Sequence, residues 1–176
     1  MKLNRFFYLL PVAALFLLPA CNDDDMEEPE NEEELITDMT FALTGGGETV
    51  TLTFSDPDGD GGNDPTITGG TLQANTTYTG VITLSNPDEN ITEEIEEEAD
   101  EHVFLFRSSP TSLITSVTRD DAGATGLEST IVTGDAGSGD FKVILRHEPD
   151  KSADLNDFDA VGGETDIEVD FPITVQ

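Results

Sequence analysis

Cysteine is nearly absent from this chain, since Cys21 is the only one among 176 residues. The chain after Cys21 therefore has no disulfide framework, no thiolate metal site and no thiol nucleophile. Its fold must be held together by a hydrophobic core alone. Residues 35–176 are enough for one ordinary domain with such a core.

Basic residues are scarce as well: seven Lys and Arg stand against 38 Asp and Glu, giving a formal net charge of −31. Nucleic acids and anionic lipid surfaces carry the same sign of charge, so the composition argues against both as partners. Two interpretations of the acidity stay open. It provides a solvated surface suited to a saline setting, or it captures cations or docks a basic partner.

Long apolar runs are limited to one, over residues 6–18, which is shorter than the roughly 20 residues of a membrane-spanning helix. Lys2 and Arg5 precede the run, and the motif LPAC, ending at Cys21, follows it. This arrangement is typical of a signal peptide, and its end resembles a bacterial lipobox. We expect residues 1–20 to be removed and Cys21 to carry lipid chains that anchor the protein to a membrane. The alternative is a chance cysteine at a secretory cleavage site.

The segment 22–34, NDDDMEEPENEEE, is almost entirely acidic. Like charges repel one another, and the segment has little apolar surface to bury, so we expect a disordered tether of up to about 45 Å. The aspartates at 23–25 resemble the acidic export signal of surface-displayed lipoproteins of Bacteroidota. That resemblance implies the outer face of the outer membrane, with the periplasmic face as the alternative.

A helical period of 3.6 residues is missing from most of the chain beyond residue 36, and alternation with period 2 takes its place. Segment 102–107 is apolar on both faces, which is typical of a central buried strand. Pro172 has no N–H, so we expect the last strand, or its second half, at a sheet edge. The pattern predicts an all-β fold, an antiparallel β-sandwich of immunoglobulin-like size. The expected strands are 39–44, 48–54, 77–84, 102–107, 113–118, 129–133, 140–147 and 166–175.

One stretch, residues 90–101, predicts a short acidic helix of one to three turns. Asn90 and Glu93 resemble a capping box, and Ile91, Ile95 and Ala99 share one helical face. We interpret this face as packing against the sheet.

The loop SDPDGDGGNDPT, residues 55–66, concentrates aspartates in the pattern of a calcium loop. Asp56, Asp58, Asp60 and Asp64 fall on positions 1, 3, 5 and 9 of an EF-hand pattern. Ile67 occupies the twelfth position, where that pattern has a bidentate Glu, and the flanks read as strands. The sequence therefore predicts either a sandwich loop that binds calcium weakly or a solvated turn.

Histidine occurs twice, as His102 and His147. One opens an expected strand and the other closes one, so an antiparallel arrangement can bring both to the same end of the sandwich. Two imidazoles with nearby carboxylates could hold zinc, or the two imidazoles alone could clamp a haem iron. The alternative is two unrelated histidines at strand ends.

Recognised catalytic motifs are absent from the sequence: it has no G-x-S-x-G, H-E-x-x-H or P-loop. The glycine-rich segment 134–140 is interpreted as a hairpin loop, because no helix follows it to receive a phosphate. We therefore expect a protein that is not an enzyme. A hydrolase that uses an unrecognised carboxylate pair is a third, weaker class.

Three segments carry a resemblance to a known group: EEIEEEADEH (93–102), LRHEPDKSA (145–153) and GGETDIEVDFPITVQ (162–176). They resemble small Bacteroidota lipoproteins that are usually labelled as a type 1 periplasmic-binding-fold superfamily. That label implies alternating βαβ units over about twice this length, whereas the residues here predict strands. Such lipoproteins are often encoded beside TonB-dependent outer-membrane receptors, which implies a role in nutrient uptake.

The resulting expectation is a lipid-anchored, surface-exposed, non-enzymatic β-sandwich. It binds a ligand or assists an outer-membrane receptor in the uptake of a metal or haem. The alternative is a structural or adhesive surface module whose loops are stabilised by Ca²⁺.

Overall fold

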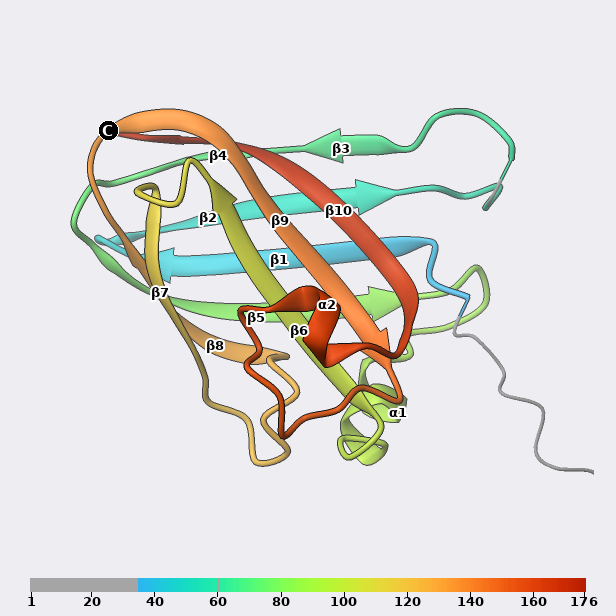
Figure 1. Cartoon of the computed structure of the whole chain (residues 1–176). Coiled ribbons are helices and arrows are strands. Elements are labelled where there is room, and N and C mark those ends of the chain that lie inside the picture. Colours follow the sequence, from blue (N-terminus) through green and yellow to red (C-terminus); the bar gives the residue numbers. More distant parts are fainter. Residues whose placement is uncertain (1–34, 60) are drawn as a thin grey trace, which may run out of the picture. The chain divides into compact units, whose positions relative to one another are not determined.

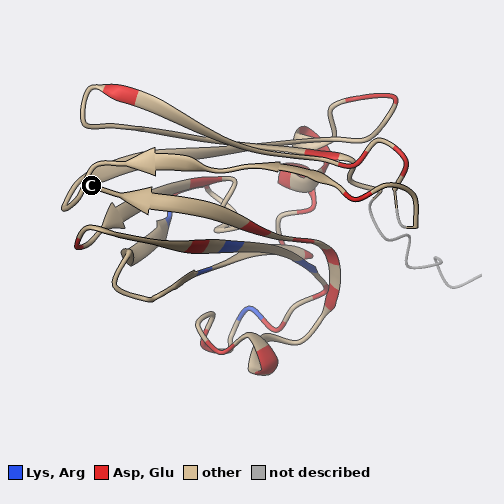
Figure 2. Ribbon diagram, turned by 90° about the horizontal axis from the view of Figure 1, so that it is seen from above, with Lys and Arg blue, Asp and Glu red and all other residues tan. Residues whose placement is uncertain are grey.

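The computed structural model describes residues 35–59 and 61–176. Its strands form two stacked sheets, seen as two layers in Figure 2 and labelled in Figure 1. The large sheet contains, in spatial order, β3 (Thr66–Thr68), β2 (Glu48–Ser55), β1 (Asp38–Gly45), β5 (Thr77–Ser85), β8 (Glu128–Thr133) and β7 (Ile114–Arg119). The small sheet contains, in spatial order, β4 (Gly70–Leu72), β10 (Glu164–Val175), β9 (Gly137–His147) and β6 (His102–Ser109).

The all-β prediction is confirmed, and neighbouring strands run antiparallel with one exception, the parallel pair β4–β10. The eight predicted strands are present with shifted ends, as β1, β2 and β5 to β10. Within the described residues, no helix has the length and apolar character needed to cross a membrane.

The main core lies between the two sheets and is built from the inward positions of the alternating strands. On β1, Met39, Phe41 and Leu43 are fully buried. The ring centroid of Phe41 lies 6.0 Å from the centroids of both Phe106 and Phe141, which belong to the opposite sheet. Burying each such side chain stabilises the fold by about 1.5–3 kcal/mol, which is how a domain without disulfides is held together.

Strand β6 is buried on both faces but does not lie in the centre of its sheet. Its inner face contributes Phe104 to the main core, while Val103 and Leu105 on its outer face are also fully buried. The segment 149–163, with the short helix α2 (Phe158–Val161), covers this outer face and packs Val161 against it. The prediction of a central strand was therefore wrong: β6 is an edge strand that a covering segment buries from outside.

Strand β10 corrects the expectation drawn from Pro172. Among the described residues, no strand pairs with the outer side of β10 before Pro172, whereas Ile173–Val175 pair with β4. The edge prediction therefore holds for the first half of β10 and is wrong for its end. The cause is the short strand β4, whose three residues contain too few positions to show a period.

Helix α1 (Thr92–Glu97) lies within the predicted stretch, but its capping box was wrong. Ile91 is the N-cap residue and makes no side-chain cap bond, while Asn90 Oδ1 accepts a hydrogen bond from Thr92 N at 3.0 Å. Ile91 and Ile95 are buried in the main core, as the apolar face predicts.

The glycine-rich segment 134–140 is not a hairpin loop. It leaves β8 in the large sheet and enters β9 in the small sheet, so it crosses between the two layers. A Cβ atom on Gly139 would lie 2.0 Å from the backbone oxygen of Ser109. Close approach of two backbones therefore accounts for a glycine at this position.

Candidate functional site

His102 and His147 are direct cross-strand partners on β6 and β9. Their ring centroids are 4.7 Å apart and their planes differ by 11°, so the imidazoles lie face to face. The predicted meeting of the two histidines at one end of the sandwich is thus confirmed. His102 is completely buried, and His147 is 7% exposed.

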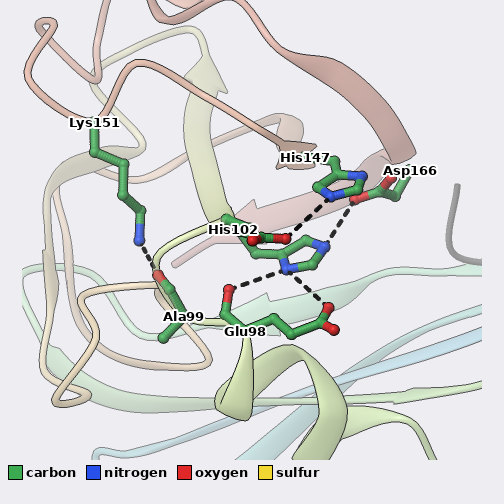
Figure 3. Close-up of polar contacts among 7 residues, drawn as sticks. Glu98, Ala99, His102, His147, Lys151 and Asp166 are labelled. Carbon is green, nitrogen blue, oxygen red and sulfur yellow. Dashed lines mark hydrogen bonds and ion pairs between the residues drawn. The ribbon is translucent and has the colours of Figure 1, made fainter. Parts of the chain in front are cut away.

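Three acidic residues surround the pair, as Figure 3 shows. His102 Nδ1 lies 3.3 Å from the backbone oxygen of Glu98 and 3.9 Å from its carboxylate. His102 Nε2 lies 3.8 Å from Asp166 Oδ2, and the side chain of Asp166 is fully buried. His147 Nε2 lies 3.8 Å from Glu101 Oε2. We call these five residues the histidine cluster.

Asp166 comes from an irregularity of β10 rather than from its regular alternation. The pairing of β10 with β9 shifts register between Thr165 and Ile167, which is a β-bulge. A bulge adds one residue to a strand and re-aims side chains next to it. Strict alternation would place Asp166 outside with Glu168, so sequence reasoning missed it. Among 38 acidic residues, no signal in the sequence distinguishes this one.

Two ring nitrogens of the cluster are buried without a hydrogen bond. Within the described part of the chain, neither His102 Nε2 nor His147 Nδ1 has a hydrogen-bond partner. Buried polar atoms are nearly always paired, and an exception calls for a cause such as an ion or a water molecule.

Burial also fixes the charge state of His102. Loss of hydration in the core lowers the pKa of His102, and the charge of His147 lowers it further. The Glu98 carbonyl and the carboxylates of Glu98 and Glu101 raise the pKa in part, but the net direction is downward. His102 is therefore neutral at neutral pH, the form in which imidazole binds metal ions.

A pocket of about 590 Å³ adjoins the histidine cluster, and we call it the acidic pocket. Asp166 and Glu168 line it from β10, and Asp56 and Asp64 line it from the loop between β2 and β3. The aspartate loop and the histidine pair were independent features of the sequence. Asp166 connects them, because it lines the pocket and lies against His102.

The predicted calcium ligands are only partly brought together. Asp58 Oδ2 accepts hydrogen bonds from the backbone and side-chain nitrogens of Asn63, at 2.9 and 2.8 Å, and these bonds lower the pKa of Asp58. Asp56 and Asp64 line the acidic pocket, while Asp60 lies outside the described residues. Over residues 35–59 and 61–176, no three His, Cys, Asp or Glu side chains are close enough to hold a metal ion without moving. Calcium binding stays a prediction.

The haem version of the histidine hypothesis finds no support in this geometry. Two axial ligands of a haem iron approach from opposite sides of the porphyrin, whereas these two rings stack against each other inside the protein. The lipidation residue Cys21 lies outside the described residues.

No protein-family model, curated protein or solved structure matches this chain.

Proposed function

We propose that this protein is a lipid-anchored, non-enzymatic surface protein that binds a divalent transition-metal ion. Zinc is the representative ion, and the ligands are His102, His147 and Asp166. One observation carries the proposal: two stacked, buried histidines each leave a ring nitrogen without a hydrogen bond, beside a buried carboxylate.

The donor set suits zinc. Two imidazoles and one carboxylate are a common set of protein ligands for this ion, and they leave a fourth position for water. Two ligands of one tetrahedral zinc ion lie about 3.4 Å apart, given bonds of about 2.0–2.1 Å. His102 Nε2 and Asp166 Oδ2 are 3.8 Å apart, so a small side-chain movement brings both to ligand distance. His147 is stacked on His102, so its ring must rotate out of the stacked arrangement to become the third ligand.

The acidic pocket supports the same ligand class. Carboxylates on its wall create a negative potential that raises the local concentration of cations. Asp166 belongs both to this wall and to the histidine cluster. A cation that enters the pocket therefore reaches Asp166, whose carboxylate lies 3.8 Å from His102 Nε2.

The cellular setting is proposed from the sequence. The LPAC motif at Cys21 and the acidic segment 22–34 favour a lipid anchor, a tether and the outer face of the outer membrane. An accessory role for a TonB-dependent receptor in metal uptake fits that placement.

Isothermal titration of residues 22–176 with zinc at neutral pH tests the proposal. We expect one zinc ion per chain, with binding lost in His147→Gln and in Asp166→Asn. Glu168→Gln is the matched control, because Glu168 lines the same pocket and is not one of the proposed ligands; it should leave binding almost unchanged. Far-UV circular dichroism shows whether each variant is folded. Absence of zinc binding, or equal binding by folded His147→Gln, contradicts the proposal.

A structural module stabilised by calcium is the second candidate, favoured by the position of Asp56 and Asp64 on one pocket wall. It predicts that millimolar calcium raises the melting temperature, that a chelator reverses the rise, and that Asp58→Ala abolishes it. A rise with zinc alone supports the first candidate instead.

A further inference from the structure

A second pocket lies on the opposite side of the fold from β4, between the outermost strands β6 and β7 of the two sheets. It has a volume of about 280 Å³, and Leu155 and Asn156 of the covering segment form part of its wall. We call it the edge pocket. It shares no lining residue with the acidic pocket.

The edge pocket has the opposite charge to the rest of the molecule. Among residues 35–59 and 61–176, its lining contains no Asp or Glu, although the chain has 38 of them, and it contains two of the seven basic residues. These two are Arg107 and Arg119. The described lining of this pocket is therefore basic, in a chain with a net charge of −31.

Arg119 is held in place by β6. Its Nε donates a hydrogen bond to Phe104 O at 2.9 Å, and its Nη2 donates to the same oxygen. Its guanidinium carbon lies 5.5 Å from the centre of the Phe106 ring. Burial lowers the pKa of Arg119, but arginine keeps its positive charge in proteins. These bonds use two of its five N–H donors.

Arg107 is exposed and lies at the mouth of the pocket. Its Nη2 donates a hydrogen bond to Asn156 O at 2.7 Å, and its guanidinium stacks 3.9 Å above the ring of Phe158. The stacking fixes the plane of the guanidinium and leaves most of its N–H donors available. A planar, fixed guanidinium can hold a carboxylate through two parallel hydrogen bonds.

The remaining lining combines an apolar floor with a polar rim. Phe106 is 8% exposed and Phe141 is fully buried beneath it. Thr111, Thr115 and Ser116 contribute hydroxyl groups that are open to solvent. Small-molecule sites in proteins have this mixture of apolar walls and a few polar groups, and 280 Å³ is near the lower end of their sizes.

We infer that the edge pocket binds a small carboxylate-bearing molecule. The carboxylate pairs with Arg107 at the mouth, Arg119 adds positive charge deeper in the pocket, and the body of the ligand lies on Phe106 and Phe141. The inference is independent of the proposed metal site, because the two sites share no residue.

Chemical-shift titration of the ¹⁵N-labelled chain from residue 22 onward tests the inference with two matched ligand pairs. Phenylacetate is compared with phenylacetamide, and glucuronate with glucose, so that each pair differs in the negative charge. We expect one or both carboxylates to shift backbone amides of residues 106–108 and 115–117. The neutral partner should bind about tenfold more weakly or worse, which is the loss of one charge-assisted hydrogen-bonded pair. The pair that responds also identifies the body of the ligand as aromatic or as a sugar.

Variants decide whether the binding uses this pocket. Arg107→Gln should weaken binding of the carboxylate ligand about tenfold or more. Ser116→Trp places a large side chain at an exposed lining position and should block the pocket. Arg146→Gln is the charge-matched control, because Arg146 donates a hydrogen bond to Thr165 Oγ1 and does not line the edge pocket. The inference is overturned if neither carboxylate shifts these amides, if neutral partners bind equally well, or if Arg146→Gln weakens binding as much as Arg107→Gln.

Discussion

Single residues decide the chemistry of the histidine cluster. His102 and His147 could be identified from the sequence because they are the only histidines and both stand at strand ends. Asp166 could not, because its position depends on a bulge that no local pattern marks. The ligand set that we propose therefore contains two residues that sequence reasoning found and one that only the fold supplies.

His102 should make the stability of the fold depend on pH. Burial lowers its pKa in the folded state, whereas the unfolded chain takes up this proton near pH 6.5. Below about pH 6.5 the unfolded chain binds more protons at this position, so the contribution of His102 to stability falls as the pH drops toward the folded pKa. The contribution is complete above about pH 6.5.

Urea unfolding of the wild-type chain and of His102→Gln, between about pH 8 and pH 5, measures this contribution. The comparison with the variant is needed because this chain has many other ionisable side chains, 38 Asp and Glu among them. We expect the wild type to lose stability relative to the variant as the pH falls. If the free energies of unfolding of the wild type and the variant change in parallel with pH, His102 has the same pKa in the folded and unfolded states, and the prediction is wrong.

At the scale of the elements, alternation along the chain predicted the long strands well, and the arrangement of the strands poorly. Strands of six or more residues are long enough to show alternation or, in β6, a continuous apolar run, and these patterns predicted all eight of them. The three-residue strands β3 and β4 are too short to show any period. Burial of both faces of β6 was predicted correctly. A sequence pattern does not say whether the strand is buried because it is central in a sheet or because a separate segment covers it.

The covering segment should contribute to stability as strongly as a core layer. Leu105 points to the outer face of the small sheet and is fully buried beneath the segment, whereas Val81 on the outer face of the large sheet is 41% exposed. We expect Leu105→Ala to lower the free energy of unfolding by about 2–5 kcal/mol. Val81→Ala should cost less than about 1 kcal/mol. Equal effects in urea titrations would mean that the segment does not pack as described.

For the whole molecule, acidic residues are few in the strands of the large sheet and more frequent elsewhere. The large-sheet strands contain Asp38, Glu48 and Glu128, and they are mostly tan in Figure 2, where acidic positions gather in the loops and the helices. The outer face of the large sheet carries threonines in rows that cross several strands: Thr49, Thr44, Thr79, Thr130 and Thr118 form one such row. Threonine favours strands and tolerates water, so these rows are solvated without charge.

The net charge of −31 should make stability depend on salt. Like charges destabilise the compact state, and salt screens them over about 10 Å at 0.1 M. We expect the melting temperature to rise when sodium chloride is increased from low to moderate concentration. Replacing Glu93, Glu94, Glu96 and Glu97 of α1 by Gln should make the rise smaller. If the melting temperature of this variant rises with salt as steeply as that of the wild type, the repulsion comes from carboxylates outside α1.

The bulge in β10 makes the histidine cluster sensitive to a change of one residue in the length of the chain. One additional residue in an otherwise regular strand separates a buried carboxylate beside His102 from a side chain in solvent. Gain or loss of a single codon near position 166 could therefore create or remove the carboxylate that we propose as a metal ligand, while the remainder of β10 keeps its pairing with β9. Among relatives of this chain, binding and non-binding members would then differ in length by one residue at this point, and the two histidines would be present in both.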